Sequence, residues 1–429
     1  MPVFTIFNHG TASHRSRTDG EIIAEFGRAA QGKEYVNFLI TDGPGATAES
    51  GAAPGEKTPM AGTFDPYTKN KVEKSAAELQ KSGFKVGFGV KHGLPGASPS
   101  YMSMNKPLKP TGLITGKGWD DNVIHAMAAI SELNPLPTVI NMIGWSRGAV
   151  TCAKMAYKLA ELYPQIAVNI FAIDPVAGMG NKGDADASAL KSNVKNYVAV
   201  LAMHEQRKTF KPQDIKRVDI APGVNALFLP FPGKHDTPVL ANSTPPETSQ
   251  MVRSLALRFM KNHGSSFTAE LAPAYPLQET CNMYAKMRVN MDDYRALRQH
   301  GFSKKALAAR AVGMGFKERD FVANKLDKYV VDAEYFINEH HREAFRRAYP
   351  KVHMYLFEGR CQTGGERAVW EEFKSMFNLL GLMESLAPFG AERPKPGEPF
   401  VMPVMGSGSK GGSDASLALH ANMMKIGLF

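Results

Sequence analysis

The sequence predicts an α/β fold, in which a mostly parallel, doubly wound sheet carries helices on both faces and a helical C-terminal part follows. Short β-rich runs alternate with helical patterns through residues 1–265, as they do in βαβ units. A glycine-flanked serine pentapeptide, residues 144–148, lies directly between an apolar run and a helical pattern. After residue 265 the strand patterns nearly vanish. Together these three observations indicate the fold class.

The first 265 residues contain the expected sheet and the helices around it. Strands are expected in the short β-branched and aromatic runs at 3–7, 35–40, 85–90, 139–143, 167–173, 197–202 and 226–229. Helices are expected in the amphipathic stretches at 19–31, 70–82, 119–133, 147–163 and 246–261. Right-handed crossovers place the carboxyl ends of such strands along one edge, so functional residues should gather there.

Two segments rich in Gly, Pro and Ser, residues 41–66 and 91–118, interrupt this alternation. Loops of this length in an α/β domain are usually lids or binding loops. Both would emerge near the carboxyl edge of the expected sheet.

The C-terminal part reads as a helical cap or second domain. Helices are expected at 286–300, 303–312, 317–328, 332–348 and 366–384, with one strand-like run at 352–357. Residues 391–416 have the composition of a linker, and residues 417–429 form a small Met-rich apolar helix that should pack back onto the body. The predicted organisation is therefore an α/β domain at 1–265, a helical cap or second domain at 266–390, and a linker with a short helix at 391–429.

Composition describes a globular protein: of 429 residues, 43% are hydrophobic and 21% are charged. The three cysteines are widely spaced, which predicts a reducing compartment and a buried, structural Cys152. No apolar run is long enough to span a membrane, and residues 1–7 lack the basic start of a signal peptide. We therefore expect synthesis in the cytoplasm, and any export would need a leaderless route.

The formal net charge of +10 favours anionic partners such as a phospholipid surface, or it reflects only a basic soluble surface. No basic motif is interleaved with aromatic residues, so we expect no nucleic acid. No group of His, Cys, Asp and Glu has metal-ligand spacing, so we expect neither a metal nor a cofactor.

Residues 144–148, Gly-Trp-Ser-Arg-Gly, have the form of the nucleophile elbow of α/β-hydrolases. The turn is so tight that a Cβ at Gly144 or Gly148 would clash, and it holds Ser146 in a strained conformation that exposes Oγ. The motif therefore predicts nucleophilic acyl transfer with Ser146 as the nucleophile.

The serine needs a base and a carboxylate that orients the base, both on loops after later strands. Asp174 is the first acid to follow a strand after the elbow, and His235 follows the run at 226–229 behind a Pro-Gly turn. The alternatives for the acid are Asp184, Asp186 and Asp236. The alternatives for the base are His204, His263 and His92.

An oxyanion hole needs two backbone N–H groups that point at the developing negative charge. One should belong to Arg147, which follows the nucleophile. The other should belong to Gly10 or Thr11, which follow the first strand and include a glycine that lets the backbone approach a ligand.

Six short motifs lie along residues 3–262 in a fixed order. They are His9-Gly10-Thr11, the glycine turns at 42–46 and 116–120, the elbow at 144–149, the segment 202–210, and the Pro-Gly-Lys-His run at 232–235. In sequence and order they resemble the uncharacterised bacterial α/β-hydrolase domain shared with type VI secretion lipase effectors. The sequence departs from the family pattern in three places. His9 and His204 each stand where the family has Asp, and the motif around Asp174 keeps only its Asp and Val.

The resemblance implies an esterase or phospholipase that acts on membrane lipids as an antibacterial or host-directed toxin. It also implies contact with a secretion machinery or an immunity protein. It says nothing of residues 266–429. Two rival classes stay open: a small-molecule esterase or thioesterase, and a catalytically inactive module that keeps the fold and binds a partner.

Overall fold

A computed structural model describes residues 2–11, 13–15, 20–44, 66–81, 119–177, 185–207, 210–297, 319, 336–358, 368–369, 371–372 and 423–429. Six parallel strands form the main sheet in the order β2-β1-β3-β4-β6-β8. These strands are β1 (Val3–Asn8), β2 (Phe38–Thr41), β3 (Val139–Trp145), β4 (Ala167–Ile173), β6 (Val194–Ala202) and β8 (Asn225–Phe231). The two-residue strands β5 (Ala189–Leu190) and β7 (Asp219–Ile220) pair separately and were not predicted.

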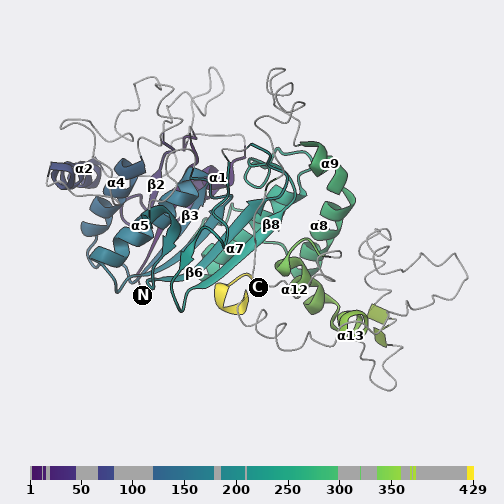
Figure 1. The fold of residues 1–429 in the computed structure, drawn as a ribbon. Coiled ribbons are helices and arrows are strands. Elements are labelled where there is room, and N and C mark those ends of the chain that lie inside the picture. The colour runs from purple at the N-terminus through teal and green to yellow at the C-terminus, as the bar shows by residue number, and fades with distance from the viewer. Residues whose placement is uncertain are drawn as a thin grey trace, which may run out of the picture.

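Helices cover both faces of the sheet (Figure 1). One face packs against α1 (Ile22–Ala29) and α7 (Glu247–Asn262), and the other against α2 (Pro66–Lys81), α4 (Trp119–Ser131) and α5 (Arg147–Leu162). Strand residues alternate between the two cores: Ile143 belongs to the first, whereas Met142 belongs to the second. This double burial explains why the strands read as nearly continuous apolar runs. The predicted α/β, doubly wound fold is confirmed.

The helices that follow α7 are gathered beyond the β8 edge of the sheet (Figure 1). They are α8 (Leu277–Val289), α9 (Met291–Ala296), α12 (Glu339–Ala348) and α13 (Pro350–Glu358), and the short α6 (Ala185–Ser188) lies earlier in the chain. Apolar residues of α8 and α9 join the core that lies under α1 and α7. The described helical part therefore shares one hydrophobic interior with the sheet.

Three expectations for this part need correction. The strand-like run at 352–357 lies in α13, which begins at Pro350, a residue suited to the first position of a helix. The helix expected at 286–300 begins earlier, after Pro276, and is divided at Asn290 into α8 and α9. The helix expected at 332–348 begins only at Glu339, where the side chain of Asn338 accepts a hydrogen bond from the N–H of His341.

Several expected segments lie wholly or mostly outside the described residues. They are the strand at 85–90, the glycine-rich segments 41–66 and 91–118, the helices at 303–312, 317–328 and 366–384, and the linker at 391–416. Among the described residues, no helix combines the length and apolar character needed to cross a bilayer.

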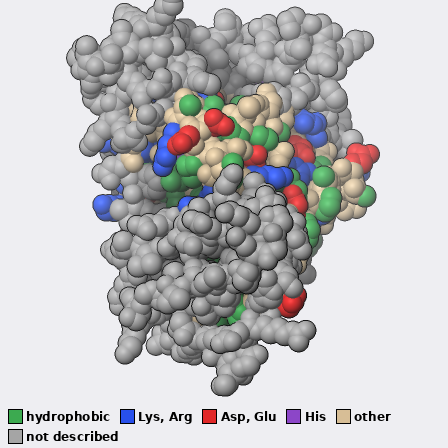
Figure 2. All heavy atoms as spheres, turned by 90° about the vertical axis from the view of Figure 1, so that its right-hand side faces the viewer, with side chains coloured by type: hydrophobic (Ala, Val, Ile, Leu, Met, Phe, Trp, Pro, Cys, Tyr) green, Lys and Arg blue, Asp and Glu red, His purple; other side chains and the backbone are tan. Residues whose placement is uncertain are grey.

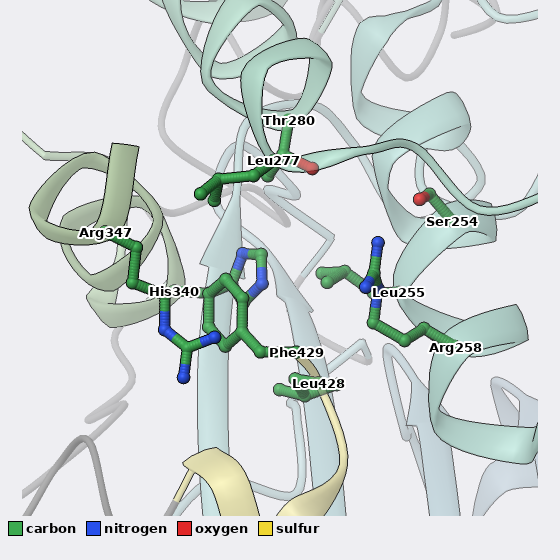
Figure 3. Close-up of a pocket in the computed structure, with 9 residues that line it drawn as sticks. All are labelled: Ser254, Leu255, Arg258, Leu277, Thr280, His340, Arg347, Leu428 and Phe429. Carbon is green, nitrogen blue, oxygen red and sulfur yellow. The ribbon is translucent and has the colours of Figure 1, made fainter. Parts of the chain in front are cut away.

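The last residues pack onto the body, as predicted. Met423, Ile426 and Leu428 are buried in the shared core, and Asn262 donates a hydrogen bond to the carbonyl of Gly427 at 2.8 Å. Phe429 stacks between the ring of His340 and the guanidinium of Arg347 beside a small pocket (Figure 3). The described helix here covers only residues 423–426.

Candidate active site

Ser146 occupies a strained turn between β3 and α5. Its φ of 55° lies in the left-handed region that non-glycine residues avoid. A Cβ on Gly144 would lie 2.5 Å from the backbone of Gly148, and a Cβ on Gly148 would lie 2.2 Å from the carbonyl oxygen of Asn8. Both glycines are therefore sterically required, as the sequence predicted.

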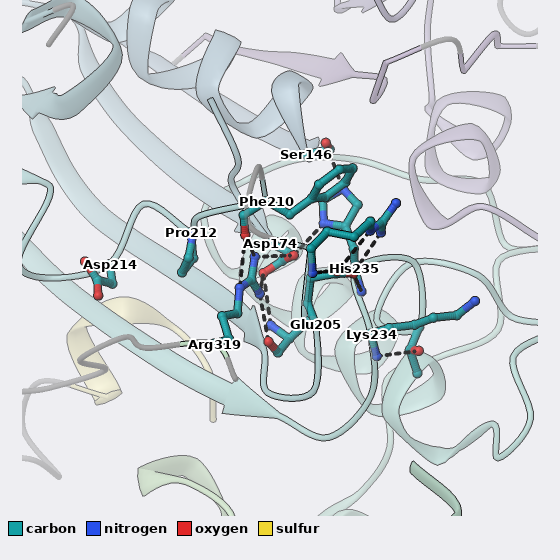
Figure 4. Close-up of polar contacts among 12 residues, drawn as sticks. Ser146, Asp174, Glu205, Phe210, Pro212, Asp214, Lys234, His235 and Arg319 are labelled. Carbon is teal, nitrogen blue, oxygen red and sulfur yellow. Dashed lines mark hydrogen bonds and ion pairs between the residues drawn. The ribbon is translucent and has the colours of Figure 1, made fainter. Parts of the chain in front are cut away.

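Three predicted side chains meet at the carboxyl edge of the sheet (Figure 4). Oγ of Ser146 lies 2.8 Å from Nε2 of His235, and Nδ1 of the same ring lies 2.5 Å from Oδ2 of Asp174. Ser146 follows β3, Asp174 follows β4 and His235 follows β8. The three groups form one hydrogen-bonded chain although they are up to 89 residues apart in sequence.

The loop after β8 aims the imidazole of His235. Gly233 has a φ of 114°, and a Cβ there would lie within 2.5 Å of the Thr237 side chain. The indole Nε1 of Trp145 donates to the carbonyl of His235 at 3.2 Å, and the edge-on ring of Phe210 lies with its centroid 4.7 Å from that of the imidazole. The Trp145 ring also packs on the imidazole, with centroids 5.4 Å apart, so the imidazole is held by two rings and by hydrogen bonds at both nitrogens.

Asp174 is fully buried and ionised. Its Oδ1 accepts the N–H of Ala202 at 3.0 Å and a nitrogen of Arg319 at 2.6 Å. Burial by itself would raise the pKa of Asp174, but the nearby Arg319 guanidinium and His235 outweigh burial and lower that pKa to about 2. The carboxylate is therefore charged at any pH at which the imidazole could act as a base.

Glu205 is a second buried carboxylate beside the imidazole; it lies in the motif at 202–210, but the sequence predicted no role for it. Its Oε2 accepts the backbone N–H of His235 at 3.2 Å, and both its oxygens accept hydrogen bonds from Arg207. Burial would raise the pKa of Glu205, yet the paired Arg207 lowers it below its usual range. Glu205 thus fixes the backbone of His235 rather than its ring.

The alternative acids and bases are engaged elsewhere. Asp186 accepts from Lys154 at 3.1 Å, and Asp236 pairs with Lys234 at 3.3 Å. Nδ1 of His204 accepts the N–H of Gly233, and Nε2 of His263 lies 2.9 Å from the carbonyl of Ile426. Asp184 and His92 lie outside the described residues.

The two expected sources of oxyanion donors lie on neighbouring segments. Arg147 is the first residue of α5, where a backbone N–H has no acceptor within the helix. The segment that contains Gly10 and Thr11 follows β1, the strand that pairs with β3. Gly148 packs against the carbonyls of this segment, and a Cβ on Gly10 would lie 2.5 Å from the Trp145 ring. The loop after β1 therefore borders the elbow directly.

The thiol of Cys152 lies beneath the elbow and is structural. It is fully buried, accepts a hydrogen bond from Asn8 at 3.1 Å and donates to the carbonyl of Gly148. Burial raises the pKa of Cys152 to about 12, so the thiol stays protonated. Among the described residues, no three His, Cys, Asp or Glu side chains are grouped so as to hold a metal ion.

Comparison with known families gives a match within the C-terminal part. Residues 288–363 are similar to a family described as a domain of unknown function, DUF5621. The match covers part of the C-terminal helices and includes Arg319, but it does not reach the strands that carry Ser146, Asp174 and His235. No curated protein matches the sequence.

Proposed function

We propose that this protein is a serine hydrolase that cleaves carboxylic esters through an acyl-enzyme on Ser146. One observation carries the proposal: a continuous hydrogen-bonded chain runs from Oγ of Ser146 through the ring of His235 to the carboxylate of Asp174. The chain starts on a strained elbow at the carboxyl edge of a parallel sheet, where sites in this fold class gather.

The chemistry follows from the roles of the three groups. Nε2 of His235 takes the Oγ proton as Oγ of Ser146 attacks the ester carbonyl carbon, and Asp174 stabilises the imidazolium that forms. The tetrahedral intermediate expels the alcohol, which leaves with the proton from His235. Water, activated by the same ring, then hydrolyses the acyl-serine and restores the free enzyme.

The oxyanion of each tetrahedral intermediate would lie at the start of α5. The N–H of Arg147 and an N–H of Gly10 or Thr11 are the donors we propose. The positive end of the α5 dipole adds to their stabilisation of the developing charge.

Lipid esters, above all phospholipids, are the substrate class we propose. The support is the resemblance of residues 3–262 to lipase effectors, together with a formal net charge of +10 that favours an anionic lipid surface. Among the described residues on the face in Figure 2, side chains of both signs are interspersed. The same resemblance supports a toxin that leaves the bacterial cytoplasm by a leaderless secretion system and meets an immunity protein.

The test is a fluorophosphonate probe, which reacts covalently with an activated serine, followed by turnover assays. Wild type, Ser146→Ala and the control Ser249→Ala are compared. Ser249 is buried on α7, where its hydroxyl donates to the carbonyl of Pro246. We expect wild type and Ser249→Ala to label and turn over equally, and Ser146→Ala to lose label and at least about 10⁴-fold in kcat because the nucleophile is gone.

The choice of substrates separates the proposed ester hydrolysis from the proposed lipid specificity. A short-chain ester, an acyl thioester and vesicles of phosphatidylglycerol are offered in parallel, and the lipid products are identified by mass spectrometry. Cleavage of the phospholipid supports the full proposal, whereas cleavage of the short ester or thioester alone rejects the lipid substrate. A folded wild-type protein that neither labels nor turns over any ester would show an inactive module.

A further inference from the structure

Arg319 contacts the proposed triad from a distant part of the chain. Nη1 and Nη2 of Arg319 lie 2.6 and 3.1 Å from the two oxygens of Asp174, 145 residues earlier in the sequence. Its other hydrogen bonds go to the carbonyls of Ala202, at 2.7 Å, and Phe210, at 2.8 and 3.2 Å (Figure 4). Only 4% of the side chain is exposed. The guanidinium is therefore fixed in one orientation with its donors in use.

The contact bears directly on the imidazole because the two cations share an acceptor. Oδ2 of Asp174 accepts from both Nδ1 of His235 and Nη2 of Arg319. A carboxylate that is already paired with a guanidinium attracts a developing imidazolium less strongly than a free carboxylate would. The same fork also fixes the plane of the carboxylate, on which the tautomer of His235 depends.

The other charged groups around His235 are paired with one another, and Arg319 is the cation that compensates Asp174. Glu205, beside the backbone of His235, is neutralised by Arg207, which in turn lies over the Phe210 ring at 3.6 Å. Lys234 and Asp236, the neighbours of His235 in sequence, pair with each other at 3.3 Å. Loss of Arg319 would therefore leave Asp174 as an uncompensated buried carboxylate facing the imidazole.

We propose that Arg319 is a positioning residue of the hydrolase: it holds Asp174 toward His235 and, by compensating the carboxylate, sets the pH below which the imidazole no longer accepts the Ser146 proton. The inference rests on the proposed function. It also assigns a role to one residue of the segment at 288–363 that is similar to the family of unknown function, since that segment completes a site built on the sheet.

The experiment measures the pH dependence of kcat/KM in the full-length protein for wild type, Arg319→Gln and Arg319→Lys. The acid limb of this profile is the range in which kcat/KM falls as the pH is lowered. For Arg319→Gln we expect this limb to move up by about one pH unit, because an Asp174 carboxylate without its guanidinium stabilises the imidazolium more strongly. We also expect kcat to fall about tenfold with KM little changed, because the carboxylate loses its fork. For Arg319→Lys, which keeps the charge but not the fork, kcat should fall while the acid limb stays in place.

The control is Arg253→Gln. Arg253 likewise makes a forked pair, with Glu25, and donates to the carbonyl of Ala272, but it has no contact with the triad. Loss of this pair should leave both the acid limb and kcat unchanged. Two results would overturn the proposal. In the first, the acid limb of Arg319→Gln coincides with that of wild type. In the second, the acid limb of Arg319→Lys moves as far as that of Arg319→Gln.

A second measurement separates this outcome from failure of the proposed function. The ring carbons of His235 are followed by NMR through a pH titration, which needs no substrate, and are assigned with His235→Gln. An upward move of the titration midpoint in Arg319→Gln supports the charge effect, and an unmoved midpoint contradicts it. The midpoint can shift in Arg319→Gln while the wild-type protein neither labels with fluorophosphonate nor turns over an ester. That result would reject the hydrolase, and with it the role of Arg319 in catalysis.

Discussion

The sheet and the C-terminal helices bury polar groups in two different ways. Across the sheet, one Asn side chain from each of β3, β4, β6 and β8 forms a line in which each amide donates to the next amide oxygen, at 2.8–3.1 Å. Histidines such as His14 and His235 are also buried near the sheet, but the helices gather three of them: His340, His341 and His353 are each at most 7% exposed. Burial lowers the pKa of all three, to about 3 for His340 and His353.

The amide line and the three imidazoles of α12 and α13 respond differently to pH. An amide line has no titrating group, whereas an imidazole that is neutral in the folded state takes up a proton on unfolding once the pH falls below about 6.5. Stability from His340 and His353 is therefore complete above about 6.5 and lost as the pH falls toward 3. Asp174, whose pKa is lowered to about 2, contributes stability that is lost only between about 4 and 2. Acid should loosen the helices first.

The largest expected effect is this selective acid loosening. Each of the three histidines adds a slope of up to about 1.4 kcal/mol per pH unit, so α12 and α13, which carry them, should lose several kcal/mol of protection between pH 7 and 4.5. Hydrogen exchange followed by mass spectrometry, corrected for the intrinsic rate, compares α12 with β3. Equal losses of protection in α12 and β3 would contradict the expectation that acid loosens the helices first. In His353→Gln, the protection of α12 should decline less steeply as the pH falls.

The next effect concerns the amide line. Asn169 both donates to Asn141 and accepts from Asn196, so Asn169→Leu leaves two buried groups unpaired, at a cost of about 1–3 kcal/mol each. The matched control is Asn225→Leu at the end of the line, which removes only one donor, in a part-buried pair. Urea unfolding should show the larger loss for Asn169→Leu, with the same difference at pH 5.5 and pH 8. A difference that varies with pH would mean that the line is coupled to a titrating group.

The smallest effect concerns the link between the sheet half and the C-terminal residues. Asn262→Ala removes the hydrogen bond to the carbonyl of Gly427 and should cost about 1 kcal/mol. Because Met423, Ile426 and Leu428 stay buried, exchange should rise at residues 423–429 without a change in ester turnover. A loss of turnover in this variant would show that the C-terminal residues reach the site.

Local patterns were enough for most of the sheet and for the elbow. The apolar run of β4 was predicted with both ends correct, because a strand that is buried on both faces is apolar throughout and ends at a turn. The elbow could be read from sequence because its glycines are required by contacts within a few residues and with the adjoining loop. The prediction failed at 352–357, where β-forming residues follow Pro350 and complete a helix that packs on α12.

Chain order and strand ends were also enough to select Asp174 and His235 from several candidates. They were not enough for Glu205, Phe210 and Arg319, which complete the surroundings of the imidazole. Arg319 is one of 51 Lys and Arg residues, in a stretch with only a helical pattern. No local signal marks it, because its role depends on a contact made across 145 residues.

The sequence by itself determined the parallel sheet, the strained serine and the order of its partners, because these depend on apolar periodicity, on glycine sterics and on where strands end. Only the tertiary structure decided which arginine compensates the buried carboxylate and which histidines are held neutral among the helices. Both depend on desolvation and on the distance between charges, and these arise only when segments far apart in the chain are packed together.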